Sequence, residues 1–242
     1  MEQVSAWLRM PEEKRPRLIA IAVDEPAKSA LAYGPDAPQT RAAVRRVDAL
    51  IGRLHAELGK TGLPVDLVVV SDRGIAKRQG SWITLNAYSD LKGLETVGSL
   101  LYGATEADRA QVYNQLKKAT SEFMAYRLAN LPAELHLAAN TRMGDPVVYA
   151  TGAYAIRAHA AEHGEAAAPA GVDGFDPEVV AEMKGIFLAA GPDIVKGKTV
   201  APFANVDLYP WLAHMLGLTA PKSDGTLNIL SGTLRDNGES QQ

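Results

Sequence analysis

The 242-residue sequence contains no cysteine. Disulfides, thiolate metal sites and cysteine nucleophiles are therefore excluded, and any metal ion would need imidazole or oxygen ligands. Long apolar runs are also missing, because no stretch approaches the ~20 uninterrupted apolar residues of a membrane-spanning helix. The N-terminus lacks the apolar core of a secretory signal peptide. From the sequence as given, we expect a cytoplasmic protein that does not enter a membrane.

Positive charge is also scarce. The formal net charge is -3 and the pI is near 6.0, whereas nucleic-acid-binding surfaces usually collect Lys and Arg on one face. The densest basic cluster, Arg41, Arg45 and Arg46, lies in a predicted helix that also carries Asp48 and Glu57, which indicates a solvated helix face. Glycine-rich nucleotide loops and the GxSxG motif of serine hydrolases are absent as well. We therefore expect no nucleic-acid polymer as a partner.

The apolar residues follow an α/β pattern. Residues 17–23, RLIAIAV, form a short apolar run bounded by prolines, which predicts a buried strand. Apolar residues then recur three and four positions apart over residues 38–58, which predicts a long helix with one face on the core. The run VDLVVV at 65–70 predicts a second strand. A strand, a helix and a strand in this order favour a parallel βαβ unit.

Further elements follow the same reading. Extended segments are predicted at 81–85, 122–127, 146–150 and 185–190, and helices at 106–120 and 205–216, with Asn205 or Asp207 as the cap of the last helix. The Ala- and Gly-rich residues 162–174 predict a loop, and residues 235–242 a polar tail. We expect residues 1–234 to form a single α/β domain with a layered, mostly parallel central sheet flanked by helices.

The candidate site begins in VVVSDRGIAK, residues 68–77. A strand that runs into Ser-Asp and a glycine turn typically carries Asp72 to the edge of a sheet, where α/β proteins place their chemistry. Arg73 follows instead of a second ligand or a base. An Arg next to an Asp most simply forms an ion pair or a cap. The His159 and His163 pair is an alternative metal site, but it lacks the HExxH order and fits a polar surface equally well.

Four phrases in fixed order carry a resemblance to a known family. They are DEPAKSALAYGP from Asp24, VVVSDRGIA from Val68, ELHLAANTRMGD from Glu134 and GVDGFDPEVVAEMKGIFLAAGP from Gly171, the last running on to PFANVDLYPWLAHMLGL. Together they resemble the C-terminal half of the type I phosphodiesterase / nucleotide pyrophosphatase family, within the alkaline phosphatase superfamily. The resemblance implies part of an alkaline-phosphatase-like fold. Where that part of the sheet would be left with an open edge, we expect a homo-oligomer.

The resemblance also implies a site with two zinc ions and a threonine nucleophile. At positions where the family carries aspartate and histidine ligands, this sequence has Ala27, Leu31 and Arg73. Asp72 matches a ligand position, and Asp173 stands where the family has a histidine. No residue matches the threonine nucleophile. The resemblance therefore implies that Asp72 and Asp173 are vestigial metal positions and that no zinc or other cofactor is bound.

Two hypotheses about function follow. The first is a non-catalytic, metal-free relative of the phosphodiesterases that acts as a structural or binding module, whether a natural degenerate copy or an engineered scaffold. The second is a phosphodiesterase or phosphatase whose site is rebuilt from Asp72, Asp173, Asp24 and His163, or completed by a partner chain. Asp24 and Glu25 form a weak acid/base candidate because successive strand residues point to opposite faces.

Overall fold

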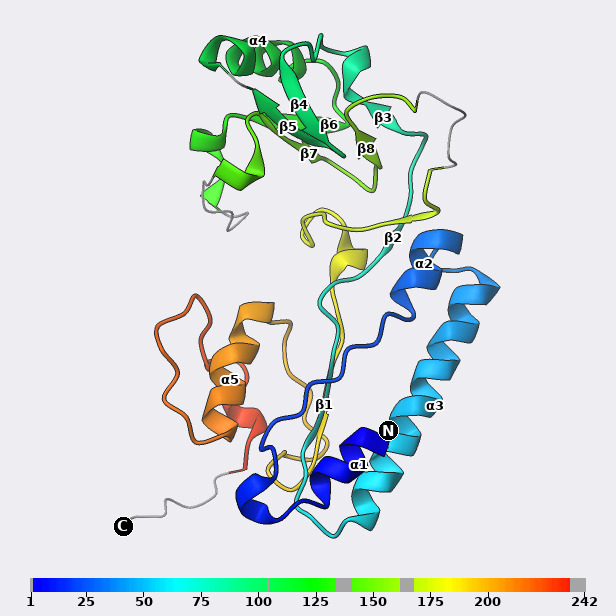
Figure 1. Cartoon of the computed structure of the whole chain (residues 1–242), viewed down its shortest axis with the longest axis vertical. Coiled ribbons are helices and arrows are strands. Elements are labelled where there is room, and N and C mark those ends of the chain that lie inside the picture. The colour runs from blue at the N-terminus through cyan, green and yellow to red at the C-terminus, as the bar shows by residue number, and fades with distance from the viewer. Residues whose placement is uncertain (1, 104, 134–140, 162–167, 236–242) are drawn as a thin grey trace. The chain divides into compact units, whose positions relative to one another are not determined.

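We describe the protein from a computed structural model, which places residues 2–103, 105–133, 141–161 and 168–235. The described chain contains five α-helices and ten β-strands, with short 3-10 helices between them (Figure 1). Its contacts divide the chain into two compact units. Unit 1 comprises Met1–Val23, Arg46–Asp72 and Gly185–Gln242, and unit 2 comprises Asp24–Arg45 and Arg73–Lys184. The long helix α3, Pro38–Lys60, contributes residues to both.

Unit 1 is built around one antiparallel strand pair. It contains α1 (Glu2–Leu8), β1 (Leu67–Val70), β10 (Phe187–Ala190) and α5 (Leu208–Met215). β1 and β10 pair so that Val69 lies opposite Leu188. Val68, Phe187 and Ala189 pack into the same cluster as the fully buried Trp211 of α5. The faces of this strand pair therefore alternate between core and surface, as expected for a half-buried ribbon.

The core of unit 1 depends on aromatic contacts and on one buried hydrogen bond. The Phe187 ring meets Phe203 and Trp211 edge to face, with centroids 5.1 and 5.4 Å apart. Such pairs contribute roughly 0.5–1.5 kcal/mol beyond the area they bury. The Trp211 indole N–H donates to Thr233 Oγ1 at 3.0 Å, so this buried donor is satisfied. The residues that follow α5 are thus anchored on its inner face.

Unit 2 contains the remaining elements. Its helices are α2 (Ala27–Tyr33) and α4 (Glu106–Leu116). Its strands are β2 (Ala76–Lys77), β3 (Ile83–Thr84), β4 (Leu94–Val97), β5 (Leu100–Gly103), β6 (Phe123–Tyr126), β7 (Val147–Ala150), β8 (Ile156–Arg157) and β9 (Gly171–Val172). The larger of its cores joins α4 to the strands through buried residues that include Leu101, Val112, Leu116 and Phe123. Thr105 and Asp108 form a capping box that starts α4.

The mixed α/β class is confirmed, and the stronger periodic signals correspond to real elements. The helix expected at 38–58 is α3, and the apolar runs at 65–70 and 185–190 contain β1 and β10. The helix expected at 205–216 is α5 with a 3-10 turn before it. Its expected cap is corrected, because the Asp207 carboxylate accepts a hydrogen bond from Thr226 N (2.7 Å) and makes no cap contact.

Strand pairing differs from the expected mostly parallel central sheet. Over the described ranges the strands form five two-stranded sheets, of which β3–β8 is parallel and the other four are antiparallel. The expected parallel partner of β1 was the run at 17–23, but that run has no strand assignment, and β10 pairs with β1 from the opposite direction. The predicted loop at 162–174 also contains a strand, the buried β9.

None of the helices in the described part of the chain is long and apolar enough to cross a membrane. Within the predicted polar tail, Arg235 is described and its backbone N–H donates to Asp193 O at 2.8 Å. The prediction of a single domain over residues 1–234 stays a prediction. The contacts of each unit are therefore treated separately below.

Candidate functional site

The end of β1 positions Asp72. Ser71 N donates to Ile186 O at 3.1 Å, and Ile186 N donates back to Ser71 Oγ at 2.8 Å. A Cβ added to Gly185 would lie 2.5 Å from Ser71 Oγ, so this exchange needs a glycine beside it. These contacts fix the backbone one residue before Asp72, whose side chain is exposed. The sequence prediction that a strand presents Asp72 at its end is therefore confirmed.

Arg73 begins the next segment, which belongs to unit 2 and is fixed by Gly74. Gly74 N donates to Met183 O at 2.9 Å. A Cβ on Gly74 would lie 1.6 Å from Glu182 O, which is far inside contact distance. Only glycine fits this close backbone approach. The glycine of the SDRG phrase therefore has a packing role that does not depend on a metal.

Asp173 follows β9, and β9 is pressed between two other elements of unit 2. β9 pairs antiparallel with β2, so that Ala76 lies opposite Val172. On its other side β9 contacts α2, where a Cβ on Gly171 would lie 2.3 Å from Ala30 O. The pairing brings the residue after β9 toward the residues that precede β2. The segments that carry Ala27 and Leu31, Arg73 and Asp173 are thus neighbours in one unit (Figure 1).

Arg73 and Asp173 form a direct ion pair. Arg73 Nε donates to Asp173 Oδ2 at 2.5 Å, although the residues are 100 positions apart. Both side chains are partly exposed, at 43% for Arg73 and 32% for Asp173. Exposed pairs of this kind contribute about 0–1 kcal/mol, because water screens the charges and holding long side chains costs entropy. The sequence analysis expected Arg73 to form an ion pair or a cap, and the pair is made with Asp173.

The other candidate ligands do not join this pair. Asp24 forms an exposed ion pair with Lys28 (2.9 Å), and this hydrogen bond and the nearby charge hold the pKa of the Asp24 carboxyl below its ordinary value. Glu25 accepts hydrogen bonds from Ser29 N and Oγ at the start of α2. His159 is exposed, whereas His163 lies outside the described residues. Within the described ranges, no group of three or more His, Asp or Glu side chains could hold a metal ion.

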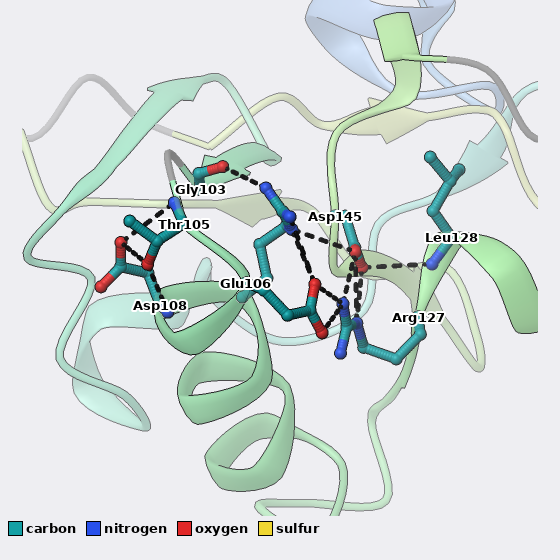
Figure 2. A network of polar contacts seen from close by, with 8 residues as sticks. Gly103, Thr105, Glu106, Asp108, Arg127, Leu128 and Asp145 are labelled. Atoms are coloured by element: carbon teal, nitrogen blue, oxygen red, sulfur yellow. Dashed lines mark hydrogen bonds and ion pairs between the residues drawn. The ribbon is translucent and has the colours of Figure 1, made fainter.

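A second Arg–Asp site, which the sequence analysis missed, lies at one end of α4. Figure 2 shows Arg127 between the carboxylates of Asp145 and Glu106. Arg127 Nη2 lies 2.9 Å from Asp145 Oδ2 and also 2.9 Å from both Glu106 oxygens. Arg109 contacts the same two acids at 3.2 and 3.6 Å. We call these four side chains the α4 network.

The α4 network has the contacts of a structural cross-link. Asp145 also accepts from Leu128 N (3.1 Å), and the Asp145 backbone N–H donates to Leu101 O. Burial raises the pKa of the Asp145 carboxyl, but the Arg127 hydrogen bonds, Leu128 N–H and the positive charges outweigh it, so the pKa is lowered overall. Asp145 therefore stays ionised near neutral pH and cannot serve there as a proton donor.

A cavity of about 250 Å³ lies in unit 2 beside β2. Its polar lining includes Lys77, Gln79, Thr151, Tyr154 and Glu182. Neither Arg73 nor Asp173 lines it. The cavity therefore does not enlarge the candidate site, and its mixed charges indicate no particular reaction.

Comparison with known proteins identifies the family. The family model for type I phosphodiesterase / nucleotide pyrophosphatase matches residues 1–176. This chain therefore belongs to the type I phosphodiesterase / nucleotide pyrophosphatase family.

Curated relatives cover nearly all of this chain. Family member 7 of the human ectonucleotide pyrophosphatases/phosphodiesterases is 29% identical over 95% of this chain and 51% of its own length. An uncharacterised pyrophosphatase/phosphodiesterase of Schizosaccharomyces pombe is 25% identical over 93% of this chain and 50% of its length. This chain thus spans about half the length of these two relatives.

Solved structures support the same fold. Murine ectonucleotide pyrophosphatase / phosphodiesterase 5 superposes with a TM-score of 0.87 at 26% identity, over 97% of this chain and 62% of that chain. An inactive variant of the same murine protein, solved in complex with AMP, superposes equally well. The human protein of the same name gives a TM-score of 0.86 at 24% identity. The alkaline-phosphatase-like fold expected from the sequence is therefore confirmed.

Proposed function

We propose that this chain is a non-catalytic member of its family that acts as a structural or binding module without zinc. The observation that carries the proposal is the ion pair between Arg73 and Asp173. The resemblance places metal ligands at both positions. Here one position supplies a permanent positive charge, and that charge is hydrogen-bonded to the carboxylate at the other position.

The chemistry of these residues does not fit zinc. Zinc needs imidazole, thiolate or carboxylate donors around one point, and the helix α2 offers the apolar side chains of Ala27 and Leu31 instead. A guanidinium cannot lose its proton in a protein, so Arg73 would repel a divalent cation placed against Asp173. The ion pair thus uses the one carboxylate that the second loop could offer.

The competing proposal is a phosphodiesterase or phosphatase with a rebuilt site. It draws support from Asp72, which keeps its place at the end of β1. It requires further ligands, yet Asp24 is paired with Lys28 and the pKa of Asp24 is lowered, so this acid is a poor general base near neutral pH. The expected cytoplasmic location and the expected absence of nucleic-acid and membrane partners stay predictions.

The experiment combines zinc content with turnover. Purified protein would be incubated with zinc, dialysed against a weak chelator and analysed for bound metal, and hydrolysis of bis-p-nitrophenyl phosphate would be followed in parallel. We expect less than stoichiometric zinc and a rate equal to that of buffer, because an activated nucleophile and stabilisation of the transition-state charge are both needed. The matched control is Asp72→Ala. Turnover that disappears in Asp72→Ala would establish the rebuilt site and overturn the proposal.

A further inference from the structure

Residues 18–23 form an extended apolar segment that lies on the surface of unit 1. Leu18, Ile21 and Val23 are 56%, 51% and 45% exposed, and the alanines between them are exposed too. Across the ranges that the structure describes, the backbone of residues 18–23 makes no hydrogen bond. The sequence has the composition of a buried strand, whereas the folded chain leaves this segment without a neighbouring strand.

Such a segment is suited to bind another strand. Unpaired backbone groups on an extended chain can form a ladder with a second chain, and apolar side chains gain free energy when the partner covers them. Seven residues in extended form span ~23 Å, which is enough for a full strand pair. We propose that residues 17–23 are the interface between two copies of this chain, which pair antiparallel about a two-fold axis through Ala20.

The sequence RLIAIAV is complementary to itself in this register. Leu18 of one copy lies opposite Ala22 of the other, and Ile19 lies opposite Ile21, so a large side chain meets a small one on one face and two branched apolar side chains meet on the other. A two-fold interface needs this property because it uses the same surface on both copies.

The charges at the two ends of the segment also favour a second copy. Arg15 and Arg17 precede the apolar residues, and Asp24 and Glu25 follow them. Antiparallel pairing brings the basic end of one copy to the acidic end of the other, whereas parallel pairing would bring like charges together. The charge pattern therefore selects both the second copy as the partner and the antiparallel direction.

Unit 1 has another exposed apolar surface, which provides the control. Leu188 on β10 is 63% exposed, and Ile186 just before it is 58% exposed. The backbone of this surface is already paired, because β10 forms a ladder with β1. Substitution of Leu188 therefore removes as much exposed apolar surface as substitution of Ile21, without touching the unpaired segment.

The experiment measures the molecular mass of the full chain, with light scattering after size exclusion, at about 50 μM and at tenfold dilution, because association follows mass action. We expect a dimer. Ile21→Asp, with Leu18→Asp as a second variant, should weaken dimerisation by roughly tenfold or more, because a charge would face the apolar strand of the other copy. Leu188→Asp should leave the dimer intact. Circular dichroism checks that each variant is folded.

Each outcome decides the proposal. A monomer at the highest concentration overturns it, and so does a dimer that survives both Ile21→Asp and Leu18→Asp. Dissociation caused by Leu188→Asp alone would assign the interface to the β1–β10 surface instead. A further variant tests the direction of pairing, because Arg17→Glu should weaken the dimer and the added change Asp24→Lys should restore part of the loss. The same weakening in the double variant would refute antiparallel pairing.

Discussion

Unit 2 contains two Arg–Asp pairs that have the same chemistry and different surroundings. Arg73 and Asp173 are 43% and 32% exposed, whereas Arg127 and Asp145 are 19% and 16% exposed. The first pair has one printed hydrogen bond between its side chains, and the second has three together with a backbone donor and a second acid. The first joins two loops, and the second joins β6 to the turn before β7.

The comparison separates the contacts that hold the fold from those that occupy the candidate site. The α4 network removes two charges from much of the solvent, so loss of either partner leaves an unpaired charge at a half-buried position. The Arg73–Asp173 pair stays in contact with water, and its loops are fixed by the close backbone contacts of Gly74 and Gly171. The same ion pair therefore has a structural role at one place and a mainly electrostatic one at the other.

The largest effect is expected for Asp145→Ala. This change leaves Arg127 with the exposed Glu106 and removes the acceptor of Leu128 N, so the free energy of unfolding should fall by about 3 kcal/mol. Urea denaturation followed by circular dichroism measures it. The matched control is Asp173→Ala, which should cost less than about 1 kcal/mol. Equal losses in the two variants would refute the contrast between the pairs.

An effect of intermediate size is expected from acid. The pKa of Asp145 is lowered from 3.8, so at acid pH the unfolded chain binds the proton first and stability rises with pH in that range. The contribution of Asp145 should be fully present above its ordinary pKa and should disappear as the pH falls through the lowered pKa of the folded state. The difference in unfolding free energy between wild type and Asp145→Asn should therefore be larger at about pH 6 than at about pH 3. A difference that does not change with pH would contradict this assignment.

The smallest effect is expected from a double-mutant cycle on Arg73 and Asp173. Arg73→Ala, Asp173→Ala and the double variant should give a coupling energy below about 1 kcal/mol, because water screens the pair. Unfolding in urea at low and at high salt provides the measurement, and the coupling should decrease as salt is added. A coupling of several kcal/mol would show that this pair is a structural cross-link like the α4 network.

Local patterns in the sequence predicted elements but not their partners. Periodic apolar residues predicted α3, and β-branched runs predicted β1 and β10, because these signals depend on neighbouring residues. The direction of β10 relative to β1 depends on a contact distant in sequence. The hairpin of β4 and β5 was missed, although its Gly98-Ser99 turn between extended residues is a recognisable hairpin signal.

The candidate site was predictable in part for the same reason. Asp72 could be placed because it follows a strand, and Ala27, Leu31, Arg73 and Asp173 could be placed because the family phrases resemble this sequence. That Arg73 pairs with Asp173 could not be predicted, since it depends on β2 pairing with β9. Arg127 and Asp145 lie in no motif that marks an ion pair. Their contact becomes visible when β6 and β7 are placed side by side.

The glycines of the candidate site have a consequence for how this protein could change. Gly74 rests against the Glu182 carbonyl and Gly171 against the Ala30 carbonyl, so main-chain packing sets the path of these loops. Side chains carried on such loops can be exchanged without redrawing the backbone. The protein therefore offers a route for retrofitting, in which donor groups introduced at positions 27, 31, 73 and 173 would be displayed on a frame that is already in place. Mutational drift at these positions would be tolerated for the same reason, while drift at Gly74 or Gly171 would not.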